Sequence, residues 1–88
     1  MTRRRHAIDD EAERWQAIAV QVTAERRARA LSQHALAELC GTTQSAIARL
    51  ERGARPPRLD TLLRIANALD CELIVQLRPR TTIRRESP

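Results

Sequence analysis

Residues 31–53 constrain the fold more than any other part of this chain, because they read as two short helices separated by a glycine. Ser32 is a favourable N-cap, since its hydroxyl oxygen can accept a hydrogen bond from the first turn of a helix. Apolar residues then follow at helical spacing, namely Leu36, Leu39 and Cys40. Gly41 ends this helix, because glycine tolerates the left-handed backbone that a sharp turn requires.

The second helix of the segment has its own start and stop signals. Thr43 is placed to cap it, and Gly53 stops it abruptly. Its inward residues are Ile47 and Leu50, and Ala37 in the first helix is small enough to let the two helices cross closely. This pattern predicts a helix-turn-helix, a motif whose second helix can lie in the major groove of DNA.

An ordinary helical hairpin without a nucleic-acid role is the alternative. The outer face of the second helix argues against it, because its side chains can donate and accept hydrogen bonds without a dense negative charge. These residues are Gln44, Ser45 and Arg49. We therefore expect residues 44–52 to form a recognition helix.

The charge balance favours a polyanionic partner. The chain of 88 residues has 16 basic and 11 acidic residues, for a net charge of +5, and every basic residue is an arginine. The planar guanidinium group suits both phosphate groups and guanine edges.

The core must be small and aliphatic, because the chain is long enough for one domain and has a single Trp and no Phe or Tyr. Such a core is marginal alone, which favours support from a partner subunit. Cys40 and Cys71 are isolated thiols without metal-ligand spacing, and we expect both to be buried as small apolar residues. No metal and no cofactor are expected.

Two further helices are expected around the motif. Residues 1–8 read as a basic N-terminal tail, and a helix follows from about residue 10 to residue 29. Acidic residues at its positive end are Asp9, Asp10, Glu11 and Glu13. Its inward stripe is Trp15, Ile18, Ala19 and Val22. After the stiff loop Arg55-Pro-Pro-Arg58, a fourth helix over 59–69 should bury Leu62, Leu63, Ile65, Ala66 and Leu69.

Residues 72–77 alternate in polarity, which predicts a short strand that ends before Pro79. Its apolar side chains are Leu73, Val75 and Leu77. A single strand in a helical domain has no ladder partner in its own chain, so either it packs loosely on the surface or it pairs antiparallel with a second copy. We expect pairing across a two-fold axis, with these side chains buried in the dimer.

The expected organisation is thus a mainly α fold of four to five helices over residues 9–77. This domain includes the dimerisation strand 72–77, and residues 78–88 form a basic C-terminal tail.

A longer pattern of residues runs through the two helices and continues into the expected fourth helix. Its members are Leu31, Ser32, Gln33, Leu36, Ala37, Gly41, Gln44, Ile47, Leu50, Glu51, Arg52, Gly53, Pro57, Leu62, Ile65, Ala66, Ala68 and Leu69. Through these residues, the segment from residue 16 to about residue 70 resembles the Cro/CI-type helix-turn-helix family, also called the XRE family. The C-terminal strand resembles that of HipB-type antitoxins, in which such strands pair in the dimer.

The resemblance implies a role for each matching polar residue. Contacts to DNA phosphates would come from Gln33, Thr43, Arg52, Arg55 and Arg58. Contacts to base edges would come from Gln44, Ser45 and Arg49, and the chemistry fits, because glutamine pairs with adenine and arginine with guanine. Arg26 and Glu51 would form a structural ion pair beneath the recognition helix.

We therefore expect a homodimeric, sequence-specific transcriptional regulator, a repressor that binds an inverted-repeat operator through helix 44–52. The alternative is an antitoxin that also binds a toxin protein and represses its own operon. The expected partners are double-stranded DNA, a second copy and, in the alternative, the toxin. No apolar run approaches the length of a membrane span, so we expect a cytoplasmic protein without membrane contact.

An enzyme is not expected. Asp9-Asp10-Glu11 reads as a helix start rather than a catalytic pair, and His6 and His34 have no companions of catalytic type. RNA binding is disfavoured, because the aromatic side chains on which RNA bases commonly stack are missing.

Overall fold

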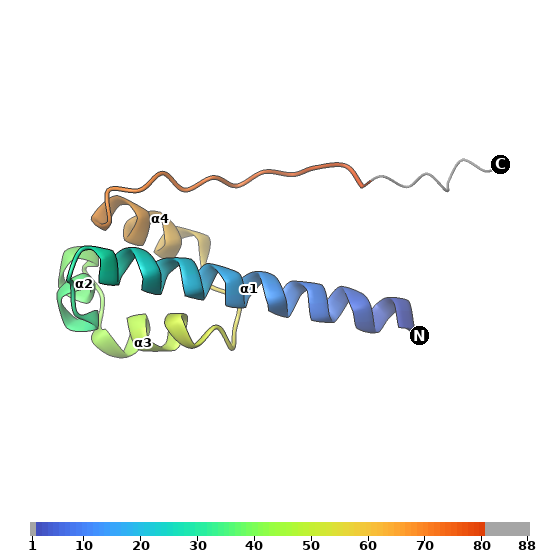
Figure 1. Ribbon diagram of the computed structural model, residues 1–88, viewed down its shortest axis with the longest axis horizontal. Helices are drawn as coiled ribbons and strands as arrows, with labels where there is room; N and C mark the ends of the chain where they lie inside the picture. Colours follow the sequence, from blue (N-terminus) through green and yellow to red (C-terminus); the bar gives the residue numbers. More distant parts are fainter. Residues whose placement is uncertain (1, 81–88) are drawn as a thin grey trace.

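The computed structural model describes residues 2–80, with side-chain environments from residue 11 onward. Its helices are α1 (Thr2–Ala28), α2 (Gln33–Cys40), α3 (Gln44–Arg52) and α4 (Leu59–Ala68). The three short helices gather against the C-terminal half of α1, and the N-terminal half of α1 extends beyond them (Figure 1). The mainly helical fold expected from the sequence is confirmed.

The start and stop signals of α2 act as the sequence predicts. The Ser32 hydroxyl oxygen accepts a hydrogen bond of 2.9 Å from the backbone N–H of Ala35. Gly41 adopts a left-handed conformation with φ of +70° and donates its N–H back to the last turn of the helix. Ala37 is buried where the two helices meet, so its small side chain permits their close approach.

Helix α3 is bounded in the same way. The Thr43 hydroxyl oxygen accepts a hydrogen bond of 3.1 Å from Ala46 N–H, and Gly53 ends the helix with φ of +67°. Gly53 also lies tightly against α1, because a Cβ atom there would be 3.1 Å from Gln16 Cα and 3.2 Å from Ala19 Cβ. The second glycine therefore serves both the turn and the packing of α3 on α1.

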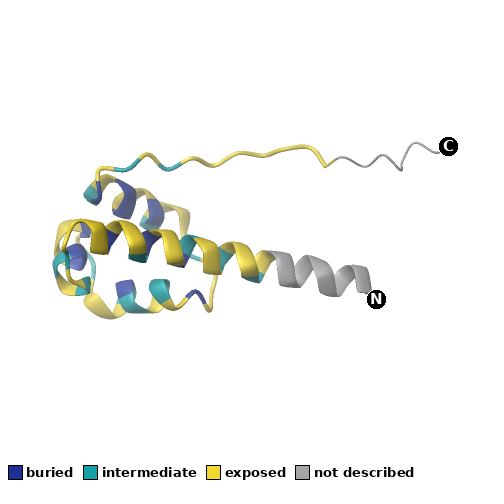
Figure 2. Ribbon diagram, in the orientation of Figure 1, coloured by how far each residue is buried: buried dark blue, intermediate teal, exposed yellow. Residues whose placement is uncertain are grey.

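The core lies between the C-terminal half of α1 and the three short helices (Figure 2). It is aliphatic, and its three fully buried large side chains come from α2, α3 and α4: Leu36, Ile47 and Ile65. Around them lie Ala19, Val22, Ala37, Cys40, Leu62, Ala66 and Leu69, all buried. Trp15 and Ile18, expected on the inward stripe of α1, are only half-buried, as is Leu50 of α3.

Leu63, which the sequence predicts to be buried, is instead exposed, and so is Leu39, which continues the apolar spacing of α2. Leu39 is 60% exposed and Leu63 is 48% exposed. Each lies roughly 100° around its helix from the centre of the buried stripe, so it falls on the flank of that stripe. Helical spacing alone gave too wide an inward face for both helices.

Helix α1 begins at Thr2 rather than near residue 10, so the segment expected as a tail continues the helix. No glycine or proline interrupts residues 2–28, and arginine, alanine and glutamate are strong helix formers. The acidic residues expected at the positive end of this helix therefore lie beyond its first turn, which contains none. The last turn contains the basic residues Arg26 and Arg27, which suit the negative end of the helix dipole.

Residues 71–80 leave α4 as an extended segment without helical structure (Figure 1). The structure has no strand within residues 2–80, so the segment expected as a strand, 72–77, finds no ladder partner in its own chain. Cys40 is buried as expected, but Cys71 is only half-buried, because it follows the last turn of α4. Most of the expected C-terminal tail, residues 81–88, lies outside the described residues.

No helix within residues 2–80 combines the length and the apolar character that crossing a membrane requires.

Candidate nucleic-acid interface

The outward face of α3 is polar and open. Its exposed side chains include all three residues expected to reach base edges: Gln44, Ser45 and Arg49. At about 100° per residue, Ser45, Arg49 and Arg52 fall within a narrow stripe, opposite the buried Ile47. Gln44 lies outside that stripe, about 100° around the helix from Ser45, and is exposed because it occupies the first turn. One face of α3 is therefore buried in the core, and the opposite face is exposed to solvent.

Three exposed arginines lie in the last turn of α3 or in the loop that follows it. Arg49, Arg52 and Arg55 form no salt bridge with another side chain of residues 11–80. Their guanidinium groups are thus free to meet an anion from outside. Arg49 and Arg52 share the outward stripe of α3, and Arg55 follows in the loop after Gly53.

Arg58, expected to contact phosphate, is placed differently. Its Nε and Nη2 atoms donate to the two carboxylate oxygens of Asp60 at 3.1 and 3.0 Å. Asp60 also accepts a hydrogen bond from Thr61 N–H in the first turn of α4. The hydrogen bond from Arg58, opposed by slight desolvation, holds the pKa of Asp60 below its ordinary value. An incoming phosphate would have to compete with this carboxylate, so Arg58 is less available than Arg55.

Beneath α3 lies the ion pair that the family resemblance implies. Arg26 donates from Nε to Glu51 Oε2 at 2.7 Å and from Nη2 to Glu51 Oε1 at 3.0 Å. The two side chains are only 9% and 7% exposed. Arg26 Nη1 also donates to the carbonyl of Leu31 at 2.8 Å. One guanidinium thus joins α1, the connection that leads to α2, and the last turn of α3.

Gln33 is a third member of this network that the sequence did not reveal. Its side-chain Nε2 donates to Glu51 Oε1 at 3.0 Å, and the residue is half-buried. The expected phosphate contact of Gln33 can then use only the second hydrogen of the amide. No local pattern links residues 33 and 51, because they meet only through the packing of α2 on α3.

The network holds Glu51 ionised. Burial alone would raise the pKa of Glu51, but hydrogen bonds from Arg26 and Gln33 outweigh it, so the pKa lies below its ordinary value. Conversely, the hydrogen bond to Glu51 outweighs desolvation and raises the pKa of Arg26. Both partners therefore stay charged at neutral pH, and the link between α1 and α3 persists.

Thr43 combines two possible contacts at the start of α3. Its Oγ1 atom accepts the capping hydrogen bond from Ala46, and its hydroxyl hydrogen remains available as a donor. The exposed first turn of α3 is also the positive end of the helix dipole. This end of the helix is therefore suited to an anion.

Comparison with known proteins agrees with this geometry. Residues 22–75 match the helix-turn-helix family, a range that runs from the last turns of α1 through α4 to the extended segment. The chain is also similar to an uncharacterised HTH-type transcriptional regulator, y4dL, of Sinorhizobium fredii, with 41% identity over 58 residues. That similarity covers 66% of this chain and 30% of the relative, so this chain corresponds to less than a third of the relative's length. The chain belongs to the XRE-type helix-turn-helix family.

Proposed function

We propose that this protein is a homodimeric, sequence-specific DNA-binding repressor that places α3 in the major groove of an inverted-repeat operator. The observation that carries the proposal is the division of α3 into two faces. Ile47 and Glu51 hold one face to the rest of the domain, whereas Ser45 and Arg49 stand exposed on the other.

The dimensions of α3 fit the groove. Its nine residues span about 13 Å at 1.5 Å per residue. The major groove of B-form DNA is about 12 Å wide and admits one helix. Within it, Gln44, Ser45 and Arg49 would read base edges, and a guanidinium can donate two hydrogen bonds to one guanine.

Phosphate contacts would surround the reading helix. Gln33 and Thr43 stand at the starts of α2 and α3, where the helix dipoles favour negative charge. Arg52 and Arg55 would reach the backbone beyond the other end of α3, and Arg58 would do so once its pairing with Asp60 is broken. This arrangement places donors on both sides of the groove.

The extended C-terminal segment supports the homodimer. Leu73 is half-buried against the domain, but Val75 is 67% exposed and Leu77 is 97% exposed. A second copy paired across a two-fold axis would cover these side chains and hold two recognition helices about 34 Å apart, one helical turn of DNA.

The test is binding to duplexes selected from a random pool, followed by fluorescence anisotropy on the full site and on its half-site. We expect an inverted repeat, tighter binding to the full site and a steep loss of affinity with salt. A promoter reporter carrying that site should fall when the protein is expressed. Absence of duplex binding at low salt would contradict the proposal, and a reporter that rises would contradict repression.

A further inference from the structure

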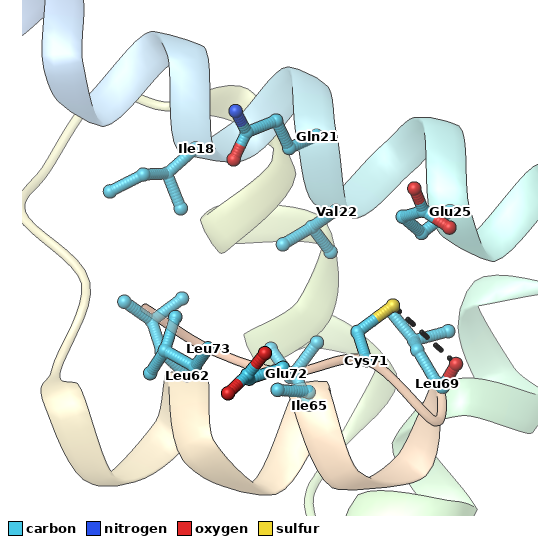
Figure 3. Close-up of a pocket in the computed structure, with 11 residues that line it drawn as sticks. Ile18, Gln21, Val22, Glu25, Leu62, Ile65, Leu69, Cys71, Glu72 and Leu73 are labelled. Atoms are coloured by element: carbon cyan, nitrogen blue, oxygen red, sulfur yellow. Dashed lines mark hydrogen bonds between the residues drawn. The ribbon is translucent and has the colours of Figure 1, made fainter. Parts of the chain in front are cut away.

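An apolar cavity of about 90 Å³ opens between α1 and α4 (Figure 3). Helix α1 packs mainly on α3, and α4 packs on α2, so α1 and α4 flank this space without filling it. Ile18 and Val22 line it from α1, Leu62 and Ile65 from α4, and Leu73 from the extended segment. Figure 3 shows Leu62 and Leu73 among the side chains that line the cavity.

The extended segment continues past the cavity with its apolar side chains uncovered. In a strand, side chains two apart share a face, so Val75 and Leu77 share the face on which Leu73 meets the domain. Yet both are exposed, because the segment has run past the end of α4 at which Leu59 lies (Figure 1). Among residues 11–80 nothing covers that face, so its apolar side chains and the unpaired backbone edge of the segment are open to a partner.

We propose that a second copy covers it in one register, centred on Val75, in which Leu77 of the partner subunit lies opposite Leu73 and helps to close the cavity. The inference rests on the proposed homodimer and adds the register and the cavity contact to it. In antiparallel pairing centred on Val75, a residue that precedes Val75 in one copy lies opposite the residue that follows Val75 by the same number of positions in the other copy. Glu72 then lies opposite Arg78 of the partner subunit, and the two-fold axis forms this pair of opposite charges twice.

The neighbouring registers are poorer. A shift of one residue would set the apolar face of one segment against the polar face of the other. A shift of two in one direction sets Leu73 opposite Pro79, which has no N–H to donate to a ladder. A shift of two in the other direction sets Glu72 opposite Gln76 and loses the charge pair. Only the register centred on Val75 pairs apolar with apolar and Glu72 with Arg78.

The test uses charge reversal and subunit exchange. Glu72→Arg alone, or Arg78→Glu alone, puts like charges opposite each other at both ends of the ladder, so each homodimer should dissociate at roughly tenfold higher Kd. A mixture of these two variants makes both pairs attractive. Native mass spectrometry should then show heterodimer well above the binomial proportion.

Arg80→Glu is the matched control, because Arg80 is also exposed and basic but lies opposite Glu72 only in the register shifted by two. Mixed with Glu72→Arg, it should give no heterodimer preference. If Glu72→Arg forms heterodimers preferentially with Arg80→Glu and not with Arg78→Glu, the proposed register is wrong. If Glu72→Arg forms heterodimers preferentially with neither variant, the two segments do not pair as a ladder.

The cavity contact has its own comparison. Leu77→Ala should weaken the dimer roughly tenfold or more, because it removes an apolar side chain twice across the axis. Ile74→Ala should weaken it less, because Ile74 is on the outward face of the ladder. Equal losses would overturn the cavity contact.

These outcomes separate the inference from the proposed function. A wild-type dimer that binds duplex DNA but shows no charge or cavity dependence refutes the register alone. A wild-type monomer refutes both the register and the homodimer, and half-site binding then shows whether DNA recognition by α3 survives.

Discussion

Arg26 and Glu51 meet in a two-point contact, with Nε–Oε2 at 2.7 Å and Nη2–Oε1 at 3.0 Å, and this contact couples α1 to the helix proposed to read DNA. The pair is almost wholly buried, and a third donor, Gln33, completes it. The orientation of α3 therefore depends on a buried ion pair and its hydrogen bonds. The outward side chains of α3 take no part in these contacts.

Removing Arg26 should destabilise the domain strongly. Arg26→Met keeps most of the side-chain length but leaves Glu51 buried without its charged partner, which should cost about 3–5 kcal/mol of unfolding free energy. Urea denaturation followed by circular dichroism measures this. The double replacement Arg26→Met with Glu51→Leu should lose less than the sum of the single losses. Additive losses would show that Arg26 and Glu51 are not coupled, and collapse of DNA affinity with unchanged stability would show that Arg26 acts at the DNA.

The Arg26–Glu51 pair should make stability depend on pH. Because the pKa of folded Glu51 lies below its ordinary value of 4.5, its contribution is fully present above pH 4.5. That contribution is lost as the pH falls through the folded pKa. Glu51→Gln should therefore narrow the difference between neutral and acidic stability, measured by urea denaturation. Parallel acid profiles for wild type and Glu51→Gln would rule out this source of pH dependence.

The two helix-ending glycines should differ in their tolerance of a methyl group. Gly41 and Gly53 share a left-handed backbone, so alanine should cost each about 1 kcal/mol for conformation. At Gly41 the new Cβ would meet open space, whereas at Gly53 it would press on the Gln16 backbone at 3.1 Å. Gly53→Ala should therefore lower the melting temperature more than Gly41→Ala. Equal shifts would mean that α1 moves aside freely.

Arg55 and Arg58 should contribute unequally to electrostatic binding. Arg55→Ala should weaken all duplexes alike and reduce the slope of log K against log salt by roughly one. Arg58→Ala should reduce it by less, because Asp60 already partly neutralises that guanidinium. Titration of one duplex at several salt concentrations compares the variants. A larger change for Arg58 would show that DNA breaks its pairing with Asp60.

The bounds of α2 and α3 could be predicted from the sequence because local chemistry sets them. Ser32 and Thr43 cap the helices, and two glycines end them, all within a few residues of the boundary. The start of α1 had no such signal, since helix-forming residues continue to Thr2. Apolar spacing likewise gives no measure of how wide each buried stripe is, which is why Leu63 was wrongly predicted to be buried.

The same distinction between local sequence signals and tertiary packing applies to the candidate site. Which side chains of α3 point outward follows from helical periodicity, and the structure leaves Gln44, Ser45 and Arg49 exposed. The pairing of Arg58 with Asp60 and the contact of Gln33 with Glu51 depend on rotamers and on packing between elements. No spacing rule encodes those contacts. The roles of these residues at DNA stay predictions.

The central claim is that the exposed face of α3 reads base sequence, and selection of binding sites from randomised duplexes tests it most directly. Wild type should select a defined site. Arg49→Ala should lose about 1–3 kcal/mol on that site and relax the preference at one or two positions. Arg64→Ala, an equal change of charge at an exposed position on α4, should leave the selected sequence unaltered. An unchanged preference in both Arg49→Ala and Gln44→Ala would contradict the account.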